Sequence, residues 1–320
     1  MTTSTEDEKD PICTAAQRLE KLVEMRLDET GSRRAFLKVF GLGVAMAAVT
    51  SGCGSKAPTS EDLFRQHYQK LTDEDKRRIF DRIERETFAR TGVSTRVGDP
   101  PPIDGVEFAY ALDLSACNGS RRCVEACARE NNLPDDMRYI QVMEVNAGSL
   151  EFDESTADYT HDTVPAKDKF YLPVQCQQCD NPPCVKACPV GATWKEADGI
   201  VVIDYDWCIG CRFCMVACPY FARRFNFAEA AVPPDRINPN QGYLSNRPRS
   251  KGVVEKCSFC LHRTRKGRMP ACLEACPTGA RKFGNLNDPN SEIRKIIQTK
   301  RTYVLKEELA TLPRFYYYFS

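Results

Sequence analysis

The cysteines carry the strongest chemical signal in the sequence, because their spacing repeats. Of 17 cysteines in 320 residues, all but Cys13 and Cys53 fall into four motifs between residues 117 and 276. The motifs contain Cys117, Cys123 and Cys127; Cys176, Cys179, Cys184 and Cys188; Cys208, Cys211, Cys214 and Cys218; and Cys257, Cys260, Cys272 and Cys276. Each motif closes with C-x-x-A-C, and proline follows the last cysteine in three of them. Four copies of one supersecondary unit are therefore predicted.

Iron-sulfur ligation explains this spacing best. A cubane cluster takes three thiolates from one tight loop, and in two-cluster ferredoxins the fourth cysteine of each run binds the other cluster. Zinc sites join two C-x2-C pairs, which the fourth motif alone would fit but the third would not. Disulfides suit exported chains, yet cysteines this close together along the chain have poor geometry for pairing with one another.

The first motif departs from the pattern at Ser120, which stands where a cysteine would complete C-x2-C-x2-C-x3-C. One cluster is therefore a thiolate short. The leading hypothesis is a 3Fe-4S cluster at this site, because an iron without a thiolate is the one most easily lost. A 4Fe-4S cluster with serine oxygen as a ligand and an empty site are the alternatives.

Other kinds of chemistry find little support in the sequence. With 45 Lys and Arg against 44 Asp and Glu, the net charge is +1, so there is no basic field to attract nucleic acid. There is no Ser/His/Asp arrangement, Gly-rich phosphate loop or nucleotide fingerprint. The three histidines, His67, His161 and His262, stand in unrelated contexts. We therefore expect no catalytic residue and no nucleic-acid partner.

The elements that position the cysteines are short. Alternating runs at 138–145 and 199–206 predict strands between the cysteine loops. The alanine before each closing cysteine is small enough for a short helix to run close to a cluster. We expect an α+β fold rich in loops, with the four motifs inside a domain at 106–290.

The flanking regions differ from this domain in composition. Residues 59–105 contain no cysteine and predict a helical arm of two helices, followed by a linker. Thr72 and Asp75 resemble a capping box, and Gly92 is a natural stop for the second helix. The C-terminal tail at 291–320 ends in an aromatic run, which would either pack against a partner or form an edge strand on its own domain.

The N-terminal residues 1–52 are expected to be an export leader. The segment SRRAFLK at 32–38 and the apolar run behind it resemble a twin-arginine signal, which exports folded proteins to the periplasm. The alternative is an arginine pair that caps a buried helix. The apolar run at 36–50 is too short to span a bilayer. Thr50-Ser51-Gly52-Cys53 resembles a lipoprotein cleavage box, apart from its unusual threonine, and would make Cys53 a lipidation site.

Residues 107–290 resemble a known family: the four-cluster ferredoxin-like subunits of dimethyl sulfoxide, polysulfide and tetrathionate reductases, alternative complex III and some periplasmic hydrogenases. The segments that carry the resemblance are PVQCQQCDNPPCVKACPVGATWK, DGIVVIDYDWCIGCRFCMVACPYFARRFN, KGVVEKCSFC and GNLNDP. It implies tandem bacterial-ferredoxin-like (dicluster) modules, here with an N-terminal helical extension.

The resemblance also implies how the cysteines are shared, since in this family motif one pairs with motif four and motif two with motif three. The implied ligand sets are a first set of Cys117, Cys123 and Cys276 beside Ser120; a second of Cys127, Cys257, Cys260 and Cys272; a third of Cys176, Cys179, Cys184 and Cys218; and a fourth of Cys188, Cys208, Cys211 and Cys214. The implied cofactors are three 4Fe-4S clusters and one 3Fe-4S cluster.

The function that follows is electron transfer without catalysis. The resemblance implies two partners: an integral membrane subunit that handles quinol, and an exported subunit that carries molybdopterin, the nickel-iron centre of a hydrogenase or several haems. The complex would lie on the periplasmic face of the cytoplasmic membrane. A free-standing periplasmic ferredoxin-type carrier is the alternative, and an assembly scaffold with structural clusters is a third hypothesis.

Overall fold

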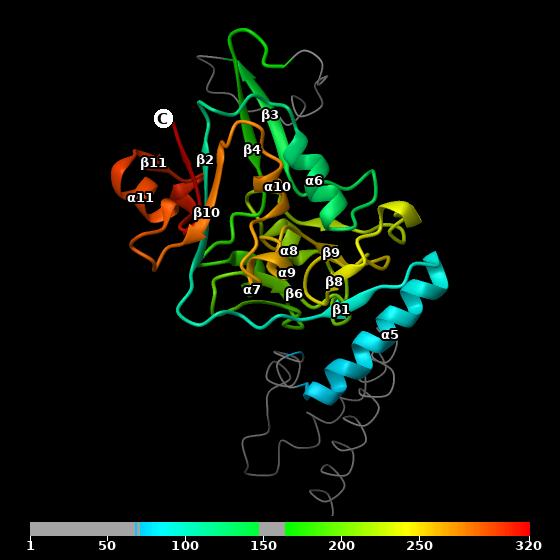
Figure 1. The fold of residues 1–320 in the computed structure, drawn as a ribbon. Helices are drawn as coiled ribbons and strands as arrows, with labels where there is room; N and C mark the ends of the chain where they lie inside the picture. The colour runs from blue at the N-terminus through cyan, green and yellow to red at the C-terminus, as the bar shows by residue number, and fades with distance from the viewer. Residues whose placement is uncertain (1–67, 69–70, 147–163) are drawn as a thin grey trace, which may run out of the picture.

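The computed structural model describes residue 68 and residues 71–146 and 164–320 (Figure 1). The leader, Cys53 and the first expected helix of the arm lie outside these residues, apart from Tyr68. The described part combines short helices with several small sheets, as the α+β expectation required. None of its helices is long and apolar enough to cross a membrane.

The largest sheet has four strands in the order β10-β2-β12-β11. They are β2 (Phe108–Asp113), β10 (Arg281–Asn285), β11 (Thr302–Tyr303) and β12 (Phe315–Tyr318). Strand β2 is buried along its whole length and alternates between two faces. Tyr110 and Leu112 enter the main core, while Ala109 and Ala111 face α11 (Glu292–Thr299), whose Ile293 packs on them.

The cysteine motifs are carried by short helices that pack in pairs. These are α6 (Arg122–Glu130), α7 (Pro183–Lys186), α8 (Phe213–Val216) and α10 (Ala271–Glu274), with α9 (Leu261–Thr264) directly after Cys260. Helix α6 packs against α10, and α7 packs against α8. Motif one is thus joined to motif four in what we call the first lobe, and motif two to motif three in the second lobe.

Small strand pairs hold the motif loops in place. They are β3 (Gln141–Asn146) with β4 (Lys169–Val174), β5 (Thr193–Lys195) with β6 (Val201–Ile203), β7 (Arg224–Phe225) with β9 (Val254–Glu255), and the parallel pair β1 (Arg96–Gly98) with β8 (Asn240–Gly242). Two 3-10 turns, η3 (Pro234–Arg236) and η4 (Glu307–Leu309), complete the description. The expected strands at 138–145 and 199–206 are confirmed as β3 and β6.

Helix α5 (Asp73–Thr91) is the second expected helix of the arm. The Thr72 hydroxyl accepts from the Asp75 amide and the Asp75 carboxylate accepts from the Thr72 amide, so the predicted capping box is present. Gly92 ends the helix at φ 72°, a left-handed conformation that glycine adopts without strain. Arg82 forms an ion pair with Asp206 at 2.7 Å, which attaches α5 to the cysteine domain. Helix α5 lies at the edge of this domain, beside β1 (Figure 1).

The C-terminal strand corrects two expectations. Strand β12 lies between β2 and β11 and is therefore an inner strand, not an edge strand. Its Phe315 and Tyr317 are fully buried, and the Phe315 ring stacks on Tyr110 at 4.9 Å, so this part of the run packs in its own domain. The expected domain boundary at residue 290 does not separate β12 from the cysteine domain, because β12 pairs in parallel with β2.

Candidate metal centres

The backbone of the four motif loops shares one feature. The third residue of each motif has a positive φ: Gly119 at 74°, Gln178 at 45°, Gly210 at 72° and Phe259 at 52°. Left-handed residues within such turns direct neighbouring N–H groups into one concavity, an arrangement that binds anions and occurs at many iron-sulfur sites. The loops are therefore shaped for a negatively charged group.

The loop around Ser120 has the same conformation as a complete cysteine loop. In motif three, Gly210 and Arg212 flank Cys211 with φ 72° and 64°; in motif one, Gly119 and Arg121 flank Ser120 with φ 74° and 55°. Ser120 thus occupies the place of Cys211. The serine replaces one ligand position and leaves the turn unchanged.

The first set gathers around one small cavity of about 20 Å³ that is partly open to solvent. Cys117, Ser120, Cys123 and Cys276 all line it. Burial raises the pKa of Cys117, and the nearby Cys123 and Cys276 raise it further. Burial also acts to raise the pKa of Cys276, but hydrogen bonds from Thr278 and the backbone bring it below the usual value.

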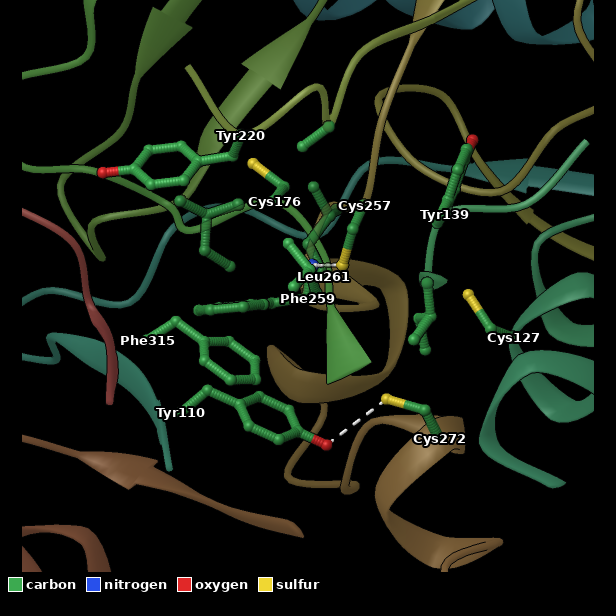
Figure 2. Close-up of a cluster of buried hydrophobic side chains, with 14 of the residues drawn as sticks. Tyr110, Cys127, Tyr139, Cys176, Tyr220, Cys257, Phe259, Leu261, Cys272 and Phe315 are labelled. Atoms are coloured by element: carbon green, nitrogen blue, oxygen red, sulfur yellow. Dashed lines mark hydrogen bonds between the residues drawn. The ribbon is translucent and has the colours of Figure 1, made fainter. Parts of the chain in front are cut away.

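The second set is fully buried. Burial raises the pKa of Cys127, and the charges of Cys257, Cys260 and Cys272 raise it further, which places all four thiols together. Asn131 donates to Cys127 Sγ at 3.6 Å and to Cys260 Sγ at 3.9 Å. Figure 2 shows Cys127, Cys257 and Cys272 around one part of the core, with the Tyr110 hydroxyl 3.3 Å from Cys272 Sγ.

The third set shows the same mutual influence. Burial raises the pKa of Cys179 to about 12, and Cys176, Cys184 and Cys218 also raise it. Burial raises the pKa of Cys218 as well, and Cys176 and Cys184 raise it further. All four implied ligands are therefore neighbours.

In the fourth set, burial raises the pKa of Cys214 to about 11, with contributions from Cys208 and Cys188. Cys211, on the same loop, is exposed, unlike the other cysteines of the described chain. The mutual effect on pKa indicates that Cys188, Cys208 and Cys214 are neighbours. Cys211 is assigned to the same set because it lies in the same loop.

The four sets adjoin one another in series. Cys123 of the first set raises the pKa of Cys127 in the second, and Cys176 of the third raises that of Cys257 in the second. The charge of Arg223 is stabilised by Cys184 of the third set and Cys214 of the fourth. The Ser120 site therefore stands at one end of the series and the exposed Cys211 at the other.

The donor set fits iron-sulfur clusters. All fifteen cysteines in the described part of the chain are free of disulfides, so their thiols are available to a metal. Coordinated thiols are deprotonated, and a cationic iron core would offset the burial and the mutual repulsion that raise the pKa of Cys127 and Cys179. Among the described residues, no three His, Cys, Asp or Glu side chains converge as they would on one metal ion. A cluster holds each thiolate on a different iron, so its ligands stand further apart.

The side chains that contact the thiols were not predicted from the sequence. Arg281 donates to Cys123 Sγ at 3.4 Å and Arg223 donates to Cys184 Sγ at 3.1 Å. A signal for them was present, since each arginine stands five residues after the last cysteine of its motif. His262, one of the three histidines in unrelated sequence contexts, is buried and binds Glu130 at 2.8 Å.

Comparison with known proteins agrees with this geometry. A family model described as a 4Fe-4S dicluster domain matches residues 167–233 and 243–286. A subunit of the selenate reductase of Mesobacillus selenatarsenatis is 39% identical, over 68% of this chain and 73% of its own. An iron-sulfur subunit of a putative dimethyl sulfoxide reductase of Halobacterium salinarum is 42% identical, over 66% and 78%.

A third relative is an Hdr-like menaquinol oxidoreductase iron-sulfur subunit of Archaeoglobus fulgidus, 40% identical over 61% of this chain and 71% of its own. The expected family and the absence of a catalytic role are confirmed by these matches, because the relatives are iron-sulfur subunits of reductase complexes. The chain therefore belongs to the dicluster ferredoxin-like iron-sulfur subunits of respiratory oxidoreductases, which transfer electrons and do not catalyse the terminal reaction.

Proposed function

We propose that this chain relays electrons through four iron-sulfur clusters between two partner subunits. The observation that carries the proposal is the serial arrangement of four thiol sets, each beside the next. A catalytic protein would need one substrate site, whereas a relay needs a row of one-electron centres. Iron-sulfur clusters supply that one-electron chemistry, and the residues around them set the potentials.

The ligands proposed for each cluster are the implied sets. The second, third and fourth sets would each hold a 4Fe-4S cluster through four cysteines. The first would hold a 3Fe-4S cluster through Cys117, Cys123 and Cys276, because Ser120 leaves the cavity with three thiols and one hydroxyl. A serine-ligated 4Fe-4S cluster is the competing occupant of this site.

The two ends of the series suggest two partners. We place an integral membrane quinol subunit at one end and an exported molybdopterin, hydrogenase or multihaem cytochrome subunit at the other. Two observations support this assignment: the relatives include subunits of a selenate reductase and a menaquinol oxidoreductase, and Cys211 brings the fourth set to the surface. The twin-arginine-like segment and the lipoprotein-like box at Cys53 favour a place for the complex on the periplasmic face.

Purification from the native membrane tests the proposal. The full chain is tagged, extracted in mild detergent and isolated, and menadiol is then added under anaerobic conditions. We expect an integral membrane subunit and a redox subunit in equal amount to the tagged chain, with bleaching of the iron-sulfur absorbance by menadiol. A chain that elutes alone at the mass of one protomer would contradict the relay and favour the free-standing carrier. Clusters that no low-potential donor reduces would favour the scaffold.

A further inference from the structure

Two buried arginines occupy equivalent positions in the two lobes. Arg223 follows Cys218 by five residues, and Arg281 follows Cys276 by five residues. Their side chains are almost completely buried, at 3% and 2% exposure. The repeat of the motif therefore extends to a buried cation in each lobe.

These arginines differ in what faces them from Arg247 and Arg265, two buried arginines that pair with carboxylates. Arg247 pairs with Asp206, and Arg265 pairs with Asp198. The groups that most stabilise the charge of Arg223 and Arg281 are cysteine thiolates, joined by a tyrosine at Arg281. Because burying a cation without an anion is costly, the negative charge of the bound thiolates is part of what holds each guanidinium in the core.

Arg281 stands between the first and second sets. Its Nη2 donates to Cys123 Sγ at 3.4 Å and its Nη1 donates to Gln175 Oε1 at 3.0 Å. It also contacts Tyr110, whose hydroxyl lies 3.3 Å from Cys272 Sγ. One guanidinium thus contacts the first set directly and the second set through a tyrosine, so it would lie beside the clusters that both sets would hold.

Arg223 stands in the same way between the third and fourth sets. Its Nη2 donates to Cys184 Sγ at 3.1 Å and to Thr193 Oγ1 at 3.0 Å, and Cys214 lies close enough to stabilise its charge. Within the described part of the chain, its Nε and Nη1 are buried with no hydrogen-bond partner. Buried donors without acceptors are costly, and the nearby Cys184 and Cys214 mean that the sulfur of a cluster held there would offer these two an acceptor.

A fixed cation affects the two redox states of a cluster unequally. Reduction adds one negative charge to the cluster, and a nearby guanidinium stabilises that charge more in a buried site than it would in water. The reduced form therefore gains more than the oxidised form. Hydrogen bonds to the sulfurs act in the same direction.

We propose that Arg223 and Arg281 are tuning residues, each of which raises the reduction potentials of both clusters in its own lobe. The proposal rests on the proposed function, since it requires the four clusters. Paired control by one residue would keep the two clusters of a lobe close in potential. Electrons would then pass between the two clusters of a lobe without a large difference in reduction potential. The difference in potential between the two lobes would depend on two separate residues.

The test is an EPR-monitored redox titration of the purified holoprotein and its Arg281→Gln and Arg223→Gln variants. Each variant is expected to lower the potentials of its own lobe, with the other lobe as an internal control. A tenfold or larger loss in the reduction equilibrium constant is expected, which corresponds to about 59 mV for one electron. Iron-replete variants with unchanged potentials, or with equal shifts in both lobes, would overturn the proposal.

A second variant tests the proposal if the clusters fail to assemble in a glutamine variant. If a glutamine variant loses iron, the lysine variant at the same position is titrated in its place. Lysine keeps the charge but ends in one ammonium, which cannot replace both the guanidinium's hydrogen bond to cysteine sulfur and its contact toward the second cluster of the lobe, so the two potentials of that lobe should move apart. Wild-type potentials in an iron-replete lysine variant would overturn the proposal. If the wild type itself lacks iron, the proposed function fails; if only the shifts are absent, the tuning inference alone fails.

Discussion

The Ser120→Cys substitution should add one iron atom to each chain. Ser120 lines the same cavity as the three thiols of the first set, and its loop has the turn conformation of motif three. The side chains differ by one atom, so the new thiol would stand where Cys211 stands in its own loop. The missing corner of the cluster would gain a ligand, while the backbone stays as it is.

The size of the change follows from the ligand count. Three thiols in the first set and four in each other set predict about 15 iron atoms per wild-type chain and about 16 in the variant. The oxidised wild type should show a three-iron EPR signal of about one spin per chain, which the variant should lose. The potential of this centre should also fall, within the roughly 1 V range that cluster type and environment span.

The assay combines iron analysis with EPR of the air-oxidised protein. The reciprocal variant, Cys211→Ser, provides a matched control, because it places serine at the same position of the equivalent loop. It should lose about one iron per chain and gain a second three-iron signal from the fourth set. A wild type with about 16 irons and no such signal would refute the reasoning, as would a Ser120→Cys variant that keeps the signal.

Three further predictions concern the surroundings of the clusters. Phe315→Ala should destabilise the domain by about 3–5 kcal/mol, and the clusters should be lost at a lower temperature on heating. Phe319→Ala, which truncates an exposed ring, should change the stability by less than about 0.5 kcal/mol. Equal effects of the two substitutions would contradict the assignment of β12 as a buried inner strand. Tyr110→Phe removes the hydroxyl 3.3 Å from Cys272 Sγ and should lower only the second cluster's potential in the same titration. Burial raises the pKa of Asp204 to about 6, so the folded state binds its proton more tightly and gains stability as the pH falls from about 7 to 5. The melting temperature of the wild type should rise relative to that of Asp204→Asn over this range, and parallel pH profiles would contradict the shift.

The chemistry of the site could be predicted because it depends on local spacing. The cysteine motifs, the capping box at Thr72 and Asp75 and the stop at Gly92 all lie within a few residues of the structure they specify. The pairing of motif one with motif four came from the resemblance, and the packing of α6 against α10 agrees with it.

What escaped prediction depends on contacts between distant residues. Strand β12 pairs with β2 across about two hundred residues, and no local pattern distinguishes an inner strand from an edge strand. The contacts of Arg223 and Arg281 with cysteine sulfur likewise join different motifs. The leader and the lipid site at Cys53 stay predictions, since they lie outside the described residues.

Four one-electron centres in series are the central feature proposed for this chain. The most direct measurement is an anaerobic reductive titration of the purified holoprotein that counts the electrons taken up per chain, with iron, zinc and sulfide measured on the same sample. We predict about four electrons and about 15 irons per chain. Uptake of two electrons or fewer, or zinc in place of iron, would contradict the four-centre relay.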